Sequence, residues 1–170
     1  VTVQISTKTR EGSLNLLLLS GVITVLVGVV IYYFSTPEKS AESHISLMAD
    51  DLAVIELGES VYAQNCASCH GADLEGQANW KQRESNGYLP APPHDETGHT
   101  WHHSDEYLFY ITKYGIEEII GKKYPNNMPA YKDQLTDDEI IAVLSYIKSV
   151  WPERIQKQHD SINARQNNTR

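Results

Sequence analysis

The feature that most constrains this chain is a long apolar run near its beginning. Residues 14–34 read LNLLLLSGVITVLVGVVIYYF, and no charged residue occurs between Glu11 and Glu38. A helix of this length rises about 31 Å, which matches the hydrocarbon thickness of a bilayer. A cleaved signal peptide has a shorter apolar stretch and a small-residue cleavage motif. The run therefore predicts a retained transmembrane helix whose YYF end lies at the membrane interface.

The residues around this run predict its orientation. Lys8 and Arg10 precede it, whereas the segment STPEKSAES after it carries one lysine and two glutamates. Positive residues favour the cytoplasmic side of a membrane. We therefore expect residues 1–13 in the cytoplasm, residues 14–34 across the lipid bilayer, and the remainder on the opposite side. Residues 35–49 are small and polar, which predicts a flexible tether.

Three amphipathic segments beyond the tether predict a small all-α domain over residues 50–151. They cover residues 50–65, 104–115 and 136–151. The second has Ser104 as a candidate N-cap and Gly115 as a stop signal. The third opens with a possible capping box formed by Thr136 and Glu139. These local signals fix the number of expected helices and their approximate ends.

Two segments of this part of the chain lack a clear apolar stripe. The loop over residues 71–103 is rich in glycine, proline and histidine. Loops of that length inside a compact domain are usually functional or wrap a ligand. Residues 152–170 are polar and predict a C-terminal tail that would fray in isolation. No segment shows the alternation typical of a strand.

Both cysteines of the chain stand in the stretch QNCASCHGADLEG, where Cys66 and Cys69 are followed directly by His70. Structural zinc would require two well-placed histidines in addition to the cysteines, which makes it the weakest interpretation. Thioredoxin-type chemistry expects a βαβ pattern nearby, and the surroundings here are helical. C-x-x-C-H is the attachment signature of c-type haem. The motif therefore predicts one covalent haem c, with His70 on the iron.

A second axial ligand is predicted from the two methionines. Met48 lies in the tether, whereas Met128 lies in the loop YPNNMPAY, 58 residues after His70. A methionine in so polar a loop has little reason to belong to a hydrophobic core. Thioether ligation opposite an imidazole favours ferrous iron and raises the reduction potential. We therefore predict that Met128 binds the iron from the far side of the haem.

The motifs CASCH and MPAY, with the order of the helices around them, resemble class I cytochrome c over about residues 50–151. The resemblance implies one haem in a helical domain whose N-terminal and C-terminal helices cross. On that pattern we expect Gly58 and Tyr62 to face Leu144 and Tyr146.

The resemblance also implies contacts around the haem. In this family a proline carbonyl accepts a hydrogen bond from the outer N–H of the proximal imidazole, which fixes the orientation of the ligand. In GYLPAPPH we expect Pro90 to play this part, with Pro92 as the competitor. We expect Trp101, helped by Arg83, to bind a haem propionate.

Three histidines set the segment DETGHTWHHSDEY apart from the simplest family members: His99, His102 and His103. In one interpretation, one of them binds iron or copper. We favour the other, in which one histidine helps the tryptophan to bind a propionate and the rest are solvated. The reason is that Met128 already fills the distal position.

The function implied is electron transfer. The chain is acidic, with 14 lysine and arginine residues against 22 aspartate and glutamate residues, which argues against a nucleic-acid partner. A six-coordinate haem leaves no open site for a substrate, so we expect an electron carrier rather than an enzyme. Its donor and acceptor would be membrane redox complexes of a bacterial respiratory or photosynthetic chain, with the haem domain in the periplasm at the inner membrane.

Two alternatives remain. In the first, the chain is a permanent haem subunit of a larger oxidoreductase, such as a terminal oxidase, a quinol-oxidising complex or a photosynthetic reaction centre. In the second, the chain is a haem sensor or a peroxidase-like catalyst, which requires Met128 to be absent from the iron or easily displaced.

Overall fold

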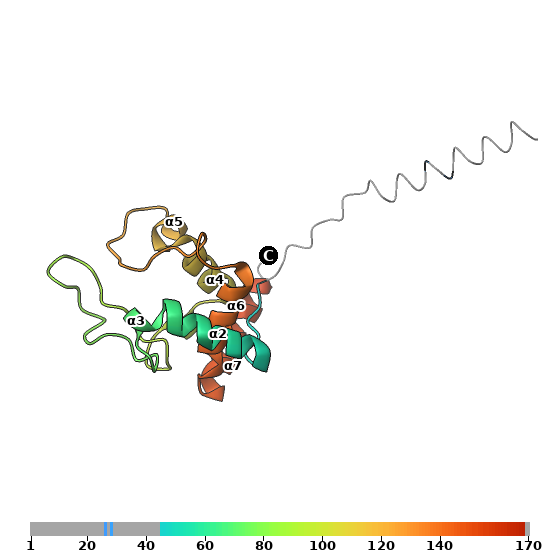
Figure 1. Ribbon diagram of the computed structural model, residues 1–170, viewed down its shortest axis with the longest axis horizontal. Coiled ribbons are helices and arrows are strands. Elements are labelled where there is room, and N and C mark those ends of the chain that lie inside the picture. Colours follow the sequence, from blue (N-terminus) through green and yellow to red (C-terminus); the bar gives the residue numbers. More distant parts are fainter. Residues whose placement is uncertain (1–25, 27, 29–44, 169–170) are drawn as a thin grey trace, which may run out of the picture. The chain divides into compact units, whose positions relative to one another are not determined.

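The computed structural model describes residues 26, 28 and 45–168, and residues 45–168 form an all-helical unit without strands. Its elements in chain order are α2 (Leu52–Asn65), α3 (Ala67–His70), the 3-10 helix η1 (Thr100–His102), α4 (Asp105–Tyr114), α5 (Ile116–Ile120), α6 (Asp137–Ser149) and α7 (Glu153–Asn167) (Figure 1). The predicted all-α class is confirmed for this unit.

The three expected helices are present with the caps that the sequence indicates. Ser104 accepts a hydrogen bond from the N–H of Tyr107 at the start of α4. Gly115 ends that helix with a positive φ of 84°. Thr136 and Glu139 form the complete capping box of α6. Because these caps are local, short sequence patterns are sufficient to predict them.

Helix α2 crosses α6 through a position without a side chain. Gly58 is buried there, and a Cβ atom on it would overlap the carbonyl oxygen of Ala142. One turn later, the rings of Tyr62 and Tyr146 lie 5.6 Å apart. The expected crossing is thus confirmed for Gly58, Tyr62 and Tyr146. Leu144 is buried in the same core, 5% exposed.

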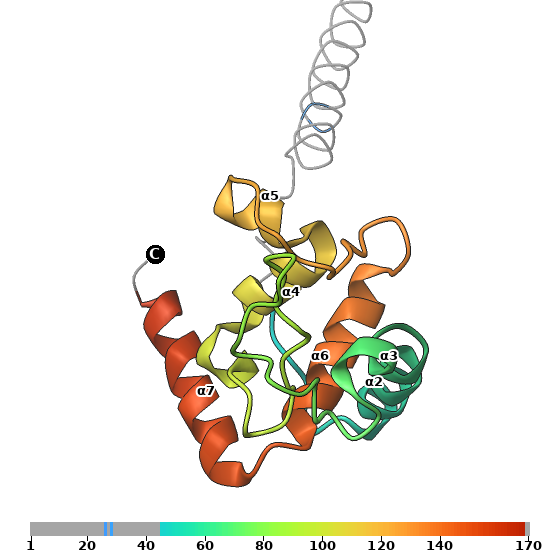
Figure 2. The same ribbon diagram turned by 90° about the vertical axis from the view of Figure 1, so that its left-hand side faces the viewer.

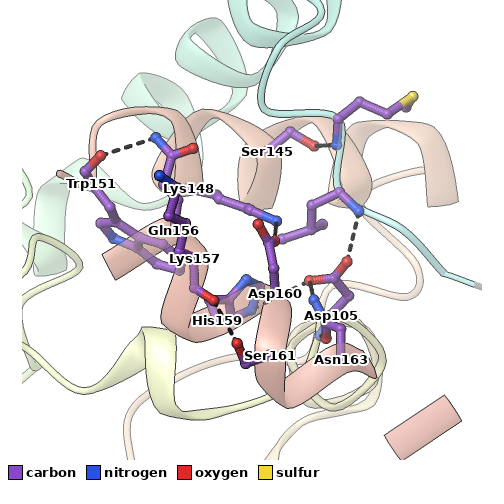
Figure 3. Close-up of polar contacts among 12 residues, drawn as sticks. Asp105, Ser145, Lys148, Trp151, Gln156, Lys157, His159, Asp160, Ser161 and Asn163 are labelled. Carbon is purple, nitrogen blue, oxygen red and sulfur yellow. Dashed lines mark hydrogen bonds and ion pairs between the residues drawn. The ribbon is translucent and has the colours of Figure 1, made fainter. Parts of the chain in front are cut away.

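The segment expected as a polar tail is a helix, which corrects the prediction for residues 152–168. Within α7, Ile155 is 1% exposed and His159 is fully buried. His159 Nε2 lies 3.3 Å from Asp105 Oδ1, and the side-chain amide of Asn163 donates to the same carboxylate at 2.8 Å (Figure 3). This helix carries no apolar stripe that the sequence could reveal, because its two buried residues are Ile155 and His159.

The folded unit also begins earlier than residue 50. Leu47 is 7% exposed and donates its N–H to Asp105 Oδ2 at 2.9 Å. The N–H of Met48 donates to Ser145 Oγ at 2.9 Å. The last residues of the expected tether are therefore packed against α4 and α6 rather than free.

The expected transmembrane helix, residues 14–34, lies outside the described residues except for Leu26 and Gly28, which are both helical. Among the described residues, no helix has the length and apolar character needed to span a membrane. The anchor stays a prediction.

Two long connections leave the helices on the same side of the folded unit (Figures 1 and 2). One follows α3, which contains His70, and runs to η1. The other joins α5 to α6 and contains Met128. The fold thus places the two proposed iron ligands in segments that border the same side.

Candidate functional site

The C-x-x-C-H motif forms one tight helical turn at the end of α2. Cys66 ends α2 by donating its N–H to the carbonyl of Tyr62, and its own carbonyl accepts the N–H of His70 at 2.9 Å. Gly71, with a φ of 85°, then turns the chain away. Tyr62 Oη donates to the carbonyl of Gly71 at 2.9 Å, which ties this turn back to α2. The motif is therefore fixed on both sides.

His70 is oriented by a hydrogen bond on its outer nitrogen. The side chain is 9% exposed, and its Nδ1 lies 2.8 Å from the carbonyl oxygen of Pro92. This is the ring's one hydrogen bond within the described part of the chain, so Nε2 stays available to bind a metal. Burial lowers the pKa of His70, which favours the neutral imidazole that coordinates metals.

The acceptor is Pro92 and not Pro90, which corrects the sequence expectation. The N–H of Gln77 donates to the carbonyl of Ala91, and the N–H of His94 donates to the carbonyl of Leu74, both at 2.8 Å. These two bonds fix the register of the loop on either side of Pro92. Its carbonyl is the one that meets the imidazole, and local sequence carries no information about that register.

The two cysteines lie at different depths. Cys66 is partly buried and Cys69 is exposed. Before haem attachment, burial raises the pKa of the Cys66 thiol to about 11. Both sulfurs belong to the turn that presents His70.

The loop of Met128 is anchored to the same end of α2. Tyr131, three residues further on, donates its Oη to the carbonyl of Asn65 at 2.8 Å. Its N–H donates to the carbonyl of Thr112 in α4 at 3.1 Å. The loop is therefore tied to the residue that directly precedes Cys66, with Met128 itself partly buried. Tyr131 was not singled out from the sequence, although the MPAY motif contains it.

Arg83 and Trp101, the two candidates for propionate binding, have protein partners. The guanidinium of Arg83 donates to the carbonyl of Gly87 at 2.7 Å and to Tyr124 Oη at 3.1 Å, so it joins the two long connections. The indole N–H of Trp101 donates to the carbonyl of Glu96 at 3.3 Å. Their contact with a propionate stays a prediction.

The three histidines of the 99–103 segment stack on aromatic rings. His99 lies against Trp80, His102 against Trp101 and His103 against Tyr107. Within the described part of the chain, no three histidine, cysteine, aspartate or glutamate side chains gather where they could hold a metal ion.

A residue that sequence reasoning missed lies directly on the proximal imidazole. The ring of His94 stacks on that of His70, with centroids 4.0 Å apart and planes 23° apart. The sequence indicates the role of His94 only through its position two residues after Pro92. That indication is usable only when Pro92 is known to be the proline that accepts the hydrogen bond.

These observations define a small helical protein built to attach a prosthetic group through C-x-x-C-H. The sequence matches the cytochrome c family over residues 55–151, more than half of the chain, and the protein belongs to that family. It is a class I cytochrome c domain with one covalently bound haem c.

Three curated relatives illustrate the match. Cytochrome c-552 of Thermus thermophilus is 32% identical over 97 residues, 55% of this chain and 67% of that protein. Cytochrome c6 of Diacronema lutheri is 33% identical over 96 residues, 54% of this chain and 90% of that protein. The cbb3-type cytochrome c oxidase subunit CcoP of Rubrivivax gelatinosus is 36% identical over 53 residues, 31% of this chain and only 17% of that subunit. No solved structure matched.

The residues present fit this cofactor. Two cysteine sulfurs and an imidazole nitrogen that has no hydrogen-bond partner among the described residues share one helical turn, and a thioether lies in a loop anchored beside it. This donor set is the one that covalent attachment and mixed imidazole–thioether ligation require.

Proposed function

We propose that this protein is a membrane-anchored c-type cytochrome that carries single electrons between redox complexes of a bacterial respiratory or photosynthetic chain. The observation that carries the proposal is the C-x-x-C-H turn, in which the Pro92 carbonyl occupies Nδ1 of His70 and leaves Nε2 for iron. The family match supports an electron-carrier role.

Each residue of the site has a separate task. Cys66 and Cys69 would hold the haem covalently, while His70 and Met128 would bind its iron. The haem iron supplies the one-electron couple when bound, and the protein sets its potential through ligand identity, burial and hydrogen bonding. The Pro92 carbonyl keeps a proton on Nδ1 and increases the basicity of Nε2. Because His70 and Met128 together would leave no open position on the iron, we propose a carrier rather than an enzyme.

An absorption spectrum of the haem-loaded protein tests the ligand set. We expect reduced bands of c-type haem and a weak far-red ferric band that arises from methionine ligation. Met128→Ala should abolish the far-red band, whereas Met48→Ala, the matched control, should keep it. Persistence of that band in the Met128 variant would overturn the ligand assignment. Carbon monoxide binding to the reduced wild-type protein at neutral pH would favour a sensor or catalyst instead.

We further propose that residues 14–34 anchor the protein in the bacterial inner membrane as a single pass, with the haem domain in the periplasm. The support is the uncharged length of the run and the basic residues that precede it. Covalent haem attachment agrees with a location outside the cytoplasm. The full chain should remain in the membrane pellet after an alkaline wash. The double substitution Val25→Arg and Val29→Arg should release the chain into the supernatant. Release of the wild-type chain would contradict the anchor.

A second candidate function is a permanent haem subunit of a larger oxidoreductase. The similarity to the oxidase subunit CcoP favours it, although that match covers a small part of CcoP. Purification in mild detergent separates the two candidates. A fixed subunit stays with its complex in high salt, whereas a diffusing carrier elutes alone.

A further inference from the structure

His94 covers the face of the proximal imidazole. Its ring lies nearly parallel to that of His70, 4.0 Å away between centroids. The hydrogen bond to Pro92 restrains His70 at Nδ1 only. A single hydrogen bond still allows the imidazole to rotate about its Cβ–Cγ bond. A flat neighbour in van der Waals contact resists that motion, because turning the imidazole would drive its edge into the second ring.

His94 is itself held at three points. Its Nδ1 lies 2.8 Å from Thr100 Oγ1. Its N–H donates to the carbonyl of Leu74 at 2.8 Å, and its carbonyl accepts the indole N–H of Trp151 at 2.7 Å. Both the backbone and the ring of His94 are therefore fixed by groups from separate parts of the fold.

The last of these contacts connects His94 to α7. Trp151 is 3% exposed and stands directly before α7, whose Gln156 side chain donates to the Trp151 carbonyl at 3.0 Å (Figure 3). The indole also meets the buried ring of His159 edge-on, with centroids 5.2 Å apart. His159 in turn lies beside Asp105 of α4. Helix α7 follows the end of the family match at residue 151.

We propose that His94 sets the rotational position of the His70 imidazole, and that α7 maintains this position through Trp151. The inference rests on the proposed role of His70 as an axial ligand. His94 is thus a positioning residue: it touches the ligand and not the iron. A helix outside the matched family region then contributes to the haem site.

Ligand orientation has its own spectroscopic signature. In low-spin ferric haem with imidazole and thioether ligands, the plane of the imidazole and the direction of the sulfur lone pair together determine which iron d orbital would hold the unpaired electron. That orbital distributes spin unequally over the four ring methyl groups, and their proton NMR resonances are shifted accordingly. At an unchanged orientation of the methionine ligand, the order and spread of these four resonances therefore report the rotation of His70. Neither stability nor the electron-transfer rate reports that rotation.

The experiment compares haem-loaded ferric variants by proton NMR. His94→Leu removes the flat ring and should change the order or spread of the four methyl resonances. His94→Phe keeps a flat ring without the Thr100 bond and should stay closer to the wild type. The matched control is Tyr110→Leu, since Tyr110 also stacks on a ring, that of Tyr114 at 19°, and is not among the residues proposed to contact the haem. This control should leave the pattern unchanged.

The proposed contribution of α7 is tested with Trp151→Phe, which removes the N–H donor to the His94 carbonyl and keeps an aromatic ring. We expect a smaller shift in the same direction as in His94→Leu. A wild-type pattern in His94→Leu, with the far-red methionine band retained, would overturn the inference but not the proposed function. Absence of that band in the wild type would overturn the proposed function first. If His94→Leu does not fold or does not take up haem, the variants Thr100→Val and Trp151→Phe test the proposal instead. Wild-type methyl patterns in both of these variants would reject it.

Discussion

At the scale of single residues, Gly58 determines whether the two helices of the core can meet. A methyl group there would overlap the carbonyl oxygen of Ala142, which is backbone and cannot turn aside. Gly58→Ala gains helix propensity but must separate α2 from α6. We expect a net loss of about 1–3 kcal/mol in the free energy of unfolding. Guanidinium unfolding followed by circular dichroism measures it.

The control for this substitution is Glu59→Ala, an exposed change in the same helix. It should alter the unfolding free energy by less than about 0.5 kcal/mol. Equal effects of the two substitutions would mean that the close crossing contributes nothing to stability.

At the scale of elements, α7 is held mainly by polar contacts, and Ile155 is the apolar side chain of this helix that is buried. Ile155 is 1% exposed within the core, whereas Ile162 two turns later is only partly buried. Ile155→Ala should therefore cost about 2–5 kcal/mol, the range for a fully buried isoleucine. Ile162→Ala, an identical change in the same helix, should cost clearly less. Similar losses from both variants, in chemical unfolding, would show that α7 does not pack as described.

The same helix shows where sequence reasoning stopped. The capping box of Thr136 and Glu139 is encoded within four residues, so the start of α6 was predictable. Two of the polar bonds that hold α7 join residues more than fifty positions apart, Asn163 to Asp105 and Gln166 to Glu106. The C-x-x-C-H ligand was likewise readable, because its geometry lies inside one turn. The choice of Pro92 as the acceptor for His70 was not predictable, because it depends on hydrogen bonds between two distant segments of the same loop.

At the scale of the whole molecule, histidines buried by folding make stability depend on pH. Besides the proposed iron ligand, burial lowers the pKa of four of them: His94, His99, His103 and His159. For His159 the nearby Asp105 opposes this effect, but burial is the larger cause. All four therefore bind protons less readily in the folded chain than in the unfolded chain, where histidine titrates near 6.5.

It follows that the unfolding free energy is highest above about pH 6.5 and falls as the pH decreases below it, because the unfolded chain then takes up more protons. A fully buried histidine such as His159 contributes about 1.4 kcal/mol to this loss for each unit by which its pKa is lowered, and the exposed His99 contributes less. Guanidinium midpoints of the haem-loaded protein at about pH 8 and about pH 5 measure the difference. His159→Leu should make the two midpoints more similar, whereas Ile155→Ala should lower both by a comparable amount. Identical wild-type midpoints at the two pH values would show that these histidines are as easily protonated in the fold as outside it.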